Sequence, residues 1–329
     1  MPGKPDFTDR FIDLTQPRLG AKVIFATDDF FAAKERLIKP EAPVFIEDKY
    51  DEHGKWMDGW ESRRKRTAGH DHCVIRLCPG TIHGLDIDTR FFTGNYPPKA
   101  SLEVCSCSGD PAAETPWHEL LQMTALQGNS HHYIVINNPG VWTHARLHIY
   151  PDGGIARLRV YGVAHYDWSG DTSDDWPDLA AMIRGGRALG CSDMHYGHMS
   201  NLIAPGRGLN MGDGWETRRR REPGNDWVIL KLGRAGRIRR VEVDTAFFKG
   251  NYPSHCSLHG ALFEETSDEE LSPQDPRWRE LLPKVPLGAD QAHLFEHEVI
   301  NESAVSHVIF NIYPDGGVSR LRLFGEFQT

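Results

Sequence analysis

The sequence predicts an all-β protein built from two copies of one antiparallel β-sandwich or barrel domain. Its 329 residues fit two domains of about 150 residues each. A ten-residue word recurs with two changes, as DTRFFTGNYP at 88–97 and DTAFFKGNYP at 244–253. Many short stretches alternate apolar and polar residues between turns rich in Gly and Pro, which is typical of antiparallel sandwiches and barrels.

Three further matches follow the same order in both halves, as a true duplication requires. They are ATDDFF with CSDMHY, DGWESRRKR with DGWETRRRR, and HIYPDGGIARLRVYG with NIYPDGGVSRLRLFG. We therefore expect a first repeat at 1–165 with a short N-terminal extension and a second repeat at 179–329. The segment 166–178 is rich in Asp, Ser and Gly, lacks periodicity and is the expected linker.

Each copy should end in a β-hairpin. Residues 141–150 alternate with a period of two, PDGG turns the chain, and 155–162 alternate again. Further strands are expected in HCVIRL and GLDIDT of the first copy, and in WVILKL and RRVEVDT of the second. Short helices are expected in TPWHELLQM and DPRWRELLP, because each has a Pro near its first turn.

Composition excludes several classes of protein. The net charge of -9 leaves no cation excess for a nucleic-acid backbone. No uncharged apolar run reaches the length of a membrane span, and the N-terminus lacks a signal-peptide core, so we expect a cytoplasmic protein with no membrane partner. The six cysteines show no CxxC spacing and are expected to be reduced thiols packed as small apolar groups.

Four long sequence motifs resemble those of a known family. ATDDFFAAKERLIKPEAPVFI, KWMDGWESRRKR, DIDTRFFTGNYPPKASLE and the paired IYPDGG words resemble allantoicase (allantoate amidinohydrolase), over about Leu14 to Phe327. The resemblance implies two tandem jelly-roll domains of the discoidin or galactose-binding type. It also implies hydrolysis of allantoate to ureidoglycolate and urea in purine catabolism. The alternative is a non-catalytic double sandwich that binds carbohydrate or another ligand, because fold does not dictate activity.

Allantoate carries one carboxylate and two ureido groups on one carbon, so its site needs a cation, acceptors for N–H groups, and an acid for the departing urea. DGWESRR offers these groups. Asp58 could position water, Trp60 could form a flat wall, Glu61 could act as acid or base, and Arg63 could clamp the carboxylate. A turn, a core tryptophan and surface ion pairs explain the same residues equally well.

A second candidate face lies on the strand at 141–150. Its alternation places His144, Arg146 and His148 on one side, where His144 could act as acid or base and Arg146 could hold an anion. The second copy keeps only the first of these, as His307. A structural histidine is the competing interpretation.

Three other residues are binding candidates that also have a structural interpretation as turn or backbone elements: Asp28, Asn95 and Tyr96. The expected equivalents of the candidates in the second copy are Asp213, Glu216, Arg218 and His307.

No metal ligand is assigned from spacing. The pairs in HDH at 70–72, in His131/His132 and in His144/His148 each lack a third ligand in a recognised pattern such as HExxH. Manganese stays open as a cofactor, because related enzymes that handle ureido compounds often use it. Besides allantoate, the expected partner is the chain itself, since exposed sheet edges favour a symmetric homo-oligomer.

Overall fold

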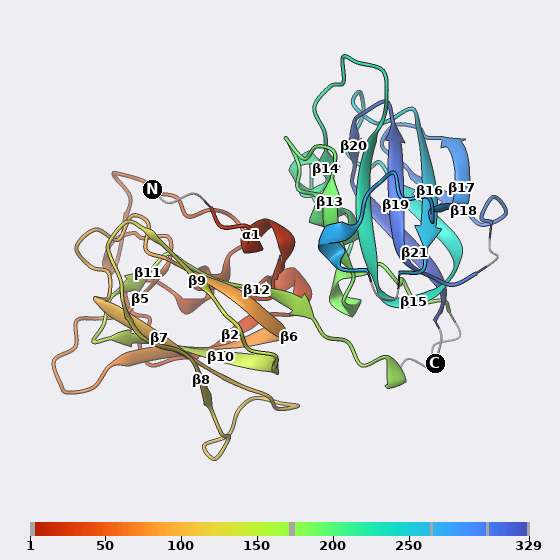
Figure 1. Cartoon of the computed structure of the whole chain (residues 1–329). Coiled ribbons are helices and arrows are strands. Elements are labelled where there is room, and N and C mark those ends of the chain that lie inside the picture. Colours follow the sequence, from red (N-terminus) through yellow and green to blue (C-terminus); the bar gives the residue numbers. More distant parts are fainter. Residues whose placement is uncertain (1–3, 171–174, 264–265, 301–302, 328–329) are drawn as a thin grey trace. The chain divides into compact units, whose positions relative to one another are not determined.

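The computed structural model describes residues 4–170, 175–263, 266–300 and 303–327, and it separates into two compact units, Met1–His165 and Tyr166–Thr329. Apart from short helices, both units are built of β-strands (Figure 1). The predicted architecture of two tandem jelly-roll sandwiches is confirmed. Residues 171–174 of the predicted linker 166–178 lie outside the described residues.

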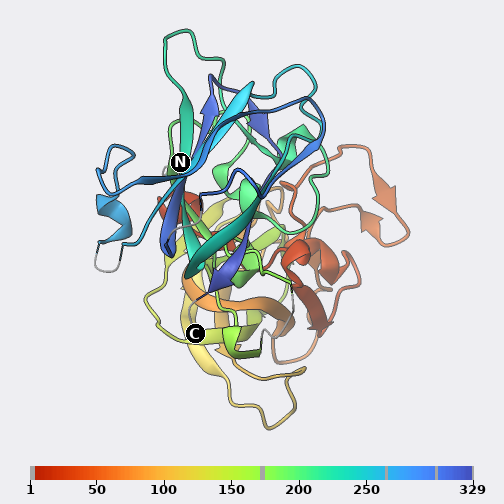
Figure 2. The same ribbon diagram turned by 90° about the vertical axis from the view of Figure 1, so that its right-hand side faces the viewer.

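In its described residues, the first unit contains twelve strands and three short helices. The strands are β1 (Ile12–Asp13), β2 (Lys22–Ala26), β3 (Tyr50–Asp51), β4 (Gly54–Lys55), β5 (Trp60–Glu61), β6 (Asp71–Asp88), β7 (Lys99–Cys105), β8 (His118–Ala125), β9 (His131–Val135), β10 (Val141–Tyr150), β11 (Gly154–Ile155) and β12 (Arg157–Ala164). The helices are α1 (Phe7–Arg10) and two 3₁₀ turns, Pro17–Leu19 and Lys34–Ile38. The β3–β4 hairpin reaches out from the rest of this unit (Figure 2).

The second unit repeats this plan over the part of it that the structure describes. Its strands are β13 (Arg187–Cys191), β14 (Trp215–Glu216), β15 (Asp226–Asp244), β16 (His255–Ala261), β17 (Arg279–Pro286), β18 (Ala292–Phe295), β19 (Val305–Tyr313), β20 (Gly317–Val318) and β21 (Arg320–Phe327). Its 3₁₀ turns are Trp168–Gly170, Met182–Arg184, Met199–Ile203, Met211–Asp213 and Asp268–Glu270. No helix in the described parts of the chain is both long and apolar enough to cross a membrane.

One long strand organises each unit. In the first unit the sheet order is β1–β12–β6–β10–β7–β8, and β2 and β9 also pair with β6. The first part of β6 pairs with β2 and β10, whereas its last part pairs with β12 and β9. Thus β6 passes from one layer of the sandwich to the other, and its side chains Ile75, Leu85 and Ile87 are fully buried between the layers. In the second unit β15 has the same role.

Two expectations about strand pairing are therefore wrong. HCVIRL and GLDIDT are not separate strands but parts of β6, and WVILKL and RRVEVDT are likewise parts of β15. The predicted hairpin is absent as well, because β10 and β12 do not pair with each other but each pair with β6. The PDGG motif predicts that the chain turns, because turn residues act locally. It does not predict which strands pair, because pairing depends on the distant strands that bury each apolar face.

The two predicted helices are also wrong. HELLQMTA forms β8 and RELLPKVP forms β17, each as an edge strand paired with its neighbour, β7 or β16. In these ladders Leu121 lies opposite Leu102, and Leu282 opposite Leu258. A helix of two turns is marginal by itself, so a continuous ladder and burial of these leucines override the short helical pattern.

The recurrence of the GNYP and PDGG words has a packing explanation. The backbone N–H of Gly154 donates to the carbonyl of Asn95 at 2.7 Å, and Gly317 donates to Asn251 at 2.8 Å. A Cβ on Gly154 would lie 2.0 Å from the ring of Phe92. Glycine is required because the backbone lies directly against a buried phenylalanine, and each copy needs the same contact.

We expect Gly154→Ala to lower the free energy of unfolding of the first unit by about 1–3 kcal/mol, because the Phe92 ring is enclosed and must move. Urea denaturation followed by circular dichroism measures this change. The matched control is Gly94→Ala, where an added Cβ meets no atom within 4 Å. Equal losses in both variants would contradict the packing argument.

Candidate functional site

Asp58, a predicted catalytic residue, forms a buried ion pair. Arg157 Nη2 donates to its Oδ2 at 2.7 Å, and Lys39 Nζ lies 3.0 Å from its Oδ1. Burial raises the pKa of Asp58, but the bonds from Arg157 and Lys39 outweigh burial and leave that pKa below its ordinary value. Arg320 and Asp213 form the same pair at 2.6 Å in the second unit. In each unit this carboxylate therefore ties the loop that carries the DGW motif to the strand of the arginine, β12 or β21.

Glu61 is almost fully buried where β5 pairs with β11. Asn95 Nδ2 donates to Glu61 Oε1 at 2.7 Å, and Asn251 makes the equivalent bond to Glu216 at 2.5 Å. Burial raises the pKa of Glu61 more than the bond from Asn95 lowers it. Tyr96 packs against the buried cluster of Met57, Phe92 and Ala156. Glu61 and Asn95 therefore meet in an enclosed contact.

Asp28 links Trp60 and Arg63 in the same loops. The Trp60 ring is fully buried, and its Nε1 donates to the Asp28 carbonyl at 2.8 Å. Arg63 pairs with the Asp28 carboxylate at 2.6 Å but remains 62% exposed. In the second unit Arg218 pairs with Asp193 at 2.9 Å, and both line a pocket of about 240 Å³. The guanidinium of Arg63 or Arg218 is thus available to an anion.

The second predicted face is divided. Arg146 and His148 meet on Glu103, at 2.6 Å and 2.8 Å. His144 is only 2% exposed, and its Nδ1 contacts the Thr143 hydroxyl and the Cys107 sulfur instead. Burial lowers the pKa of both His144 and His148. The three side chains follow one another at every second residue of β10, as predicted, but His144 bonds to Thr143 and Cys107 and not to the Glu103 carboxylate that Arg146 and His148 share.

A different acid–base pair joins β6 and β9, on the face of β6 opposite to the buried Leu85 and Ile87. Figure 1 labels both strands. His131 Nδ1 lies 2.8 Å from Asp86 Oδ2, which assigns the donor to the ring N–H. This bond raises the pKa of His131, and burial raises the pKa of Asp86. The other oxygen of Asp86 has no hydrogen-bond partner among the described residues. The His131 side chain is 27% exposed and can reach a ligand.

Arg90 lies beside this pair. Its Nε and Nη2 donate to the Asp88 carboxylate at 2.9 Å and 2.7 Å, and its side chain is 34% exposed. In the register of β6 with β9, Asp88 is opposite His131. We call Asp86, Asp88, Arg90 and His131 the acid–base cluster. Sequence reasoning missed it, although the difference between Arg90 and Ala246 in the repeated word was a signal.

The second unit lacks the two exposed groups of the acid–base cluster. Ala246 replaces Arg90, and Ala292, opposite Asp244 in the ladder, replaces His131. The corresponding face holds a pocket of about 480 Å³, which is lined by Gly206, Arg207, Glu242, Asp244, Ala292, Arg320, Arg322 and Phe324. The two copies therefore share the buried carboxylate of Asp88 and Asp244. The second unit places the exposed Arg207 3.6 Å from Asp244, but it has no imidazole at the place of His131.

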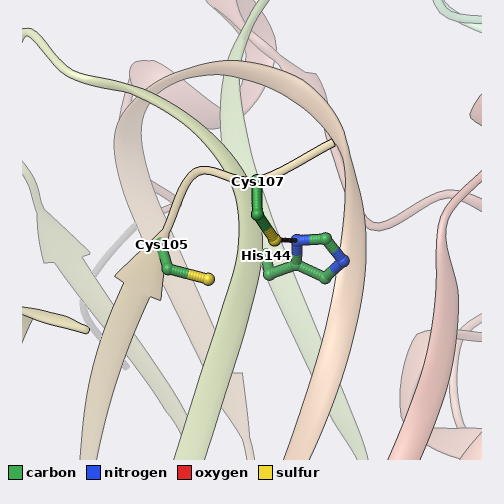
Figure 3. Close-up of side chains that lie close together, drawn as sticks. All are labelled: Cys105, Cys107 and His144. Atoms are coloured by element: carbon green, nitrogen blue, oxygen red, sulfur yellow. Dashed lines mark hydrogen bonds between the residues drawn. The ribbon is translucent and has the colours of Figure 1, made fainter. Parts of the chain in front are cut away.

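Among the described residues, one group of three potential metal ligands lies close together. It consists of Cys105, Cys107 and His144 (Figure 3). Thiolates suit soft ions and differ from the oxygen ligands that manganese prefers.

Comparisons with known proteins relate the whole chain to one family. The allantoicase repeat model matches residues 12–165 and 177–328. The chain belongs to the allantoicase family. A probable allantoicase from Photobacterium profundum is 56% identical over 96% of this chain and 97% of its own length. Probable allantoicase 2 from Burkholderia pseudomallei is 54% identical over 99% of this chain and 97% of its own length.

Solved allantoicase structures have the same fold. The crystal structure of allantoicase from Saccharomyces cerevisiae is 36% identical, covers 95% of this chain and 92% of its own, and gives a TM-score of 0.78. A second allantoicase structure is 35% identical over 97% of this chain and 94% of its own, with a TM-score of 0.79.

Asp58→Ala should destabilise this allantoicase-family chain by about 3–5 kcal/mol, because Arg157 would be left buried without its partner. The unfolding midpoint in urea measures the loss. Asp29→Ala, which removes the more exposed pair with Lys34, should cost less than about 1 kcal/mol. A small effect of Asp58→Ala on stability, combined with a large loss of activity, would instead support a catalytic role.

Proposed function

We propose that this chain is an allantoicase, which hydrolyses allantoate to ureidoglycolate and urea. Membership of the family and relatives named allantoicase along nearly its full length support the activity. We further propose that the acid–base cluster of the first unit is the site. The contact between His131 and Asp86 beside Arg90 carries this choice, because it combines a proton donor with a cation at the surface.

Arg90 binds the substrate carboxylate in this proposal. Asp88 occupies its Nε and Nη2 edge and holds the guanidinium in place. The hydrogen bonds of the Arg90 side chain to Asp88 come from Nε and Nη2, so Nη1 can donate to a carboxylate oxygen. A guanidinium fixed in this way loses little conformational entropy on binding, which favours a small anion.

His131 transfers the proton. Its Nδ1–H donates to Asp86, so Nε2 is the atom that faces the substrate. Protonated Nε2 donates to the nitrogen of the departing urea while the carbon–nitrogen bond breaks. Water then bonds to the same carbon, and its proton passes to the neutral imidazole. The hydroxyl of ureidoglycolate is formed, and His131 is again protonated for the next turnover.

The loop residues are the second proposed site. There Arg63 holds the carboxylate, Glu61 acts as the acid and Asp58 positions water. The exposed Arg63 guanidinium and the raised pKa of Glu61, caused by burial, support this alternative.

We also propose that the enzyme acts as a homo-oligomer in the cytoplasm. The edge strands β8 and β17 are each paired on one side only, which leaves backbone groups for another chain. The six cysteines are free thiols, as a reducing compartment maintains them. Light scattering after size-exclusion chromatography gives the mass, and a monomer at micromolar concentration would contradict the oligomer.

His131→Asn should lower kcat for urea release by about a hundredfold or more, with the folded state retained, because the proton donor is lost. Glu61→Gln is measured in parallel and should change kcat little. The control is His118→Asn, which alters an exposed imidazole on β8. A loss of kcat in Glu61→Gln but not in His131→Asn would favour the loop site of Asp58, Glu61 and Arg63. A wild-type protein that does not release urea from allantoate would refute the proposed activity.

Arg90→Ala should raise KM for allantoate at least about tenfold while kcat falls less, because the anion loses its cation in both ground and transition states. The substitution reproduces Ala246 of the second unit and should fold. Lys249→Ala, which removes a cation from the equivalent loop of the second unit, is the control. An unchanged KM in Arg90→Ala would remove this residue from the site.

The pH dependence should identify the acid. The bond to Asp86 raises the pKa of His131 above its ordinary value, so kcat should fall as pH rises through that higher pKa. Asp86→Asn removes the negative partner and should move this alkaline limb to lower pH. A limb that stays in place in Asp86→Asn would mean that another group supplies the proton.

A further inference from the structure

We propose that Cys105, Cys107 and His144 form a binding site in the first unit for a zinc-class metal ion. Cys105 ends β7, Cys107 lies in the loop that follows, and His144 lies on β10 opposite Cys105 in the ladder. The Cys107 sulfur faces the imidazole, and the Cys105 sulfur lies near them on the neighbouring strand (Figure 3). The site is separate from the acid–base cluster and does not depend on the proposed activity.

The distances suit one ion. The two sulfur atoms and a ring nitrogen all lie within 4.8 Å of one another, and Cys107 Sγ is 3.5 Å from His144 Nδ1. Zinc bonds of about 2.3 Å to sulfur and about 2.0 Å to nitrogen place tetrahedral sulfur and nitrogen ligands about 3.6 Å apart. The Cys107–His144 distance is therefore already that of two ligands on one ion, and a small rotation brings in Cys105.

The three side chains are open to solvent on the side of Cys107, so a metal ion and a water ligand can reach them. Cys105 and His144 are buried, whereas Cys107 is half-buried and opens the site to solvent. Asp110 is exposed, is paired with Arg76, and is close enough for its charge to act on His144. A water molecule entering from solvent can complete the tetrahedron.

Without an ion the Cys105 thiol stays protonated. Burial and the neighbouring Cys107 raise the pKa of Cys105 to about 12. A bound cation must displace this proton, since only thiolate is a ligand. The Thr143 hydroxyl lies 2.9 Å from His144 Nδ1 and 3.2 Å from the Cys107 carbonyl, so it can turn to the carbonyl when an ion takes the nitrogen.

The second unit offers an internal comparison. His307 occupies the place of His144, and Ser306 contacts its Nδ1 at 2.8 Å as Thr143 does in the first unit. Ala261 is opposite His307 in the ladder, where the first unit has Cys105. Phe263 packs edge-on against the ring of His307 at 5.4 Å. The fold thus accepts this histidine without thiols, and the pair of cysteines is an addition specific to the first unit.

The ion would tie the end of β7 and its following loop to the centre of the sheet. That loop leads to the edge strand β8, whose one partner among the described strands is β7. The expected role is stabilisation of this edge. His144 then serves as a ligand and not as the proton donor of the reaction.

The test uses the full chain, reduced and stripped with a chelator. After exposure to zinc and removal of excess metal, wild type should retain one zinc per chain by mass spectrometry and show a raised Tm. Cobalt should give thiolate charge-transfer absorption. Affinity should rise about tenfold per pH unit for each thiol proton displaced.

Cys105→Ala and Cys107→Ser should lose the zinc, the cobalt band and the Tm shift, whereas Cys191→Ser, at a half-buried thiol of the second unit, should keep all three. Cys105→Ala reproduces Ala261 of the second unit and should fold. It therefore tests the metal site even if Cys107→Ser fails to fold. A reduced wild type that retains no metal, or a Cys105→Ala variant that binds as wild type does, overturns the proposal. Formation of a Cys105–Cys107 disulfide that zinc cannot prevent would do the same.

Discussion

The structure depends on the ion pair between the DGWE loop and the strand that follows PDGG. Asp58 and Arg157 are both buried, and Asp213 pairs in the same way with the buried Arg320. Each arginine also donates to a main-chain carbonyl of the loop, so one guanidinium satisfies both side chain and backbone. Glu61 and Asn95 then fix the GNYP loop to the same place. A charge buried in this way is tolerable only while its partner is present. This interdependence explains why the words recur together.

This constraint separates the residues that hold the fold together from those that are free to differ between the two copies. Groups that hold the loops cannot be replaced independently in either copy, whereas surface groups on the same sheets can. Two partly exposed groups, Arg90 and His131, are replaced by alanines in the second copy. The cysteines at 105 and 107 are replaced by Ala261 and Phe263 without a change in the ladder. In a duplicated protein, similarity between the copies therefore indicates packing, and their differences are where chemistry is to be sought.

The sequence predicted the duplication, the β class and most strand positions, because alternation and turn residues are local signals. It did not predict that β6 is a single strand, since Gly80 and Gly84 in its middle suggested a break. These glycines are needed because the carbonyl of Val163 and the ring of Phe7 lie directly against them. Glu61 and Asn95 were both named, but their mutual contact was not foreseen. The pair of Asp86 and His131 joins residues 45 positions apart, and no local pattern reports it.

The shared central strand has a consequence for how each unit opens. Since β6 and β15 belong to both layers, neither layer can separate from the other without breaking hydrogen bonds along the same backbone. Each sandwich should then lose its protection against amide hydrogen exchange as one cooperative block, with β8 and β17 fraying earlier at the margins. Inside those margins, a domain of this kind is either closed or globally unfolded.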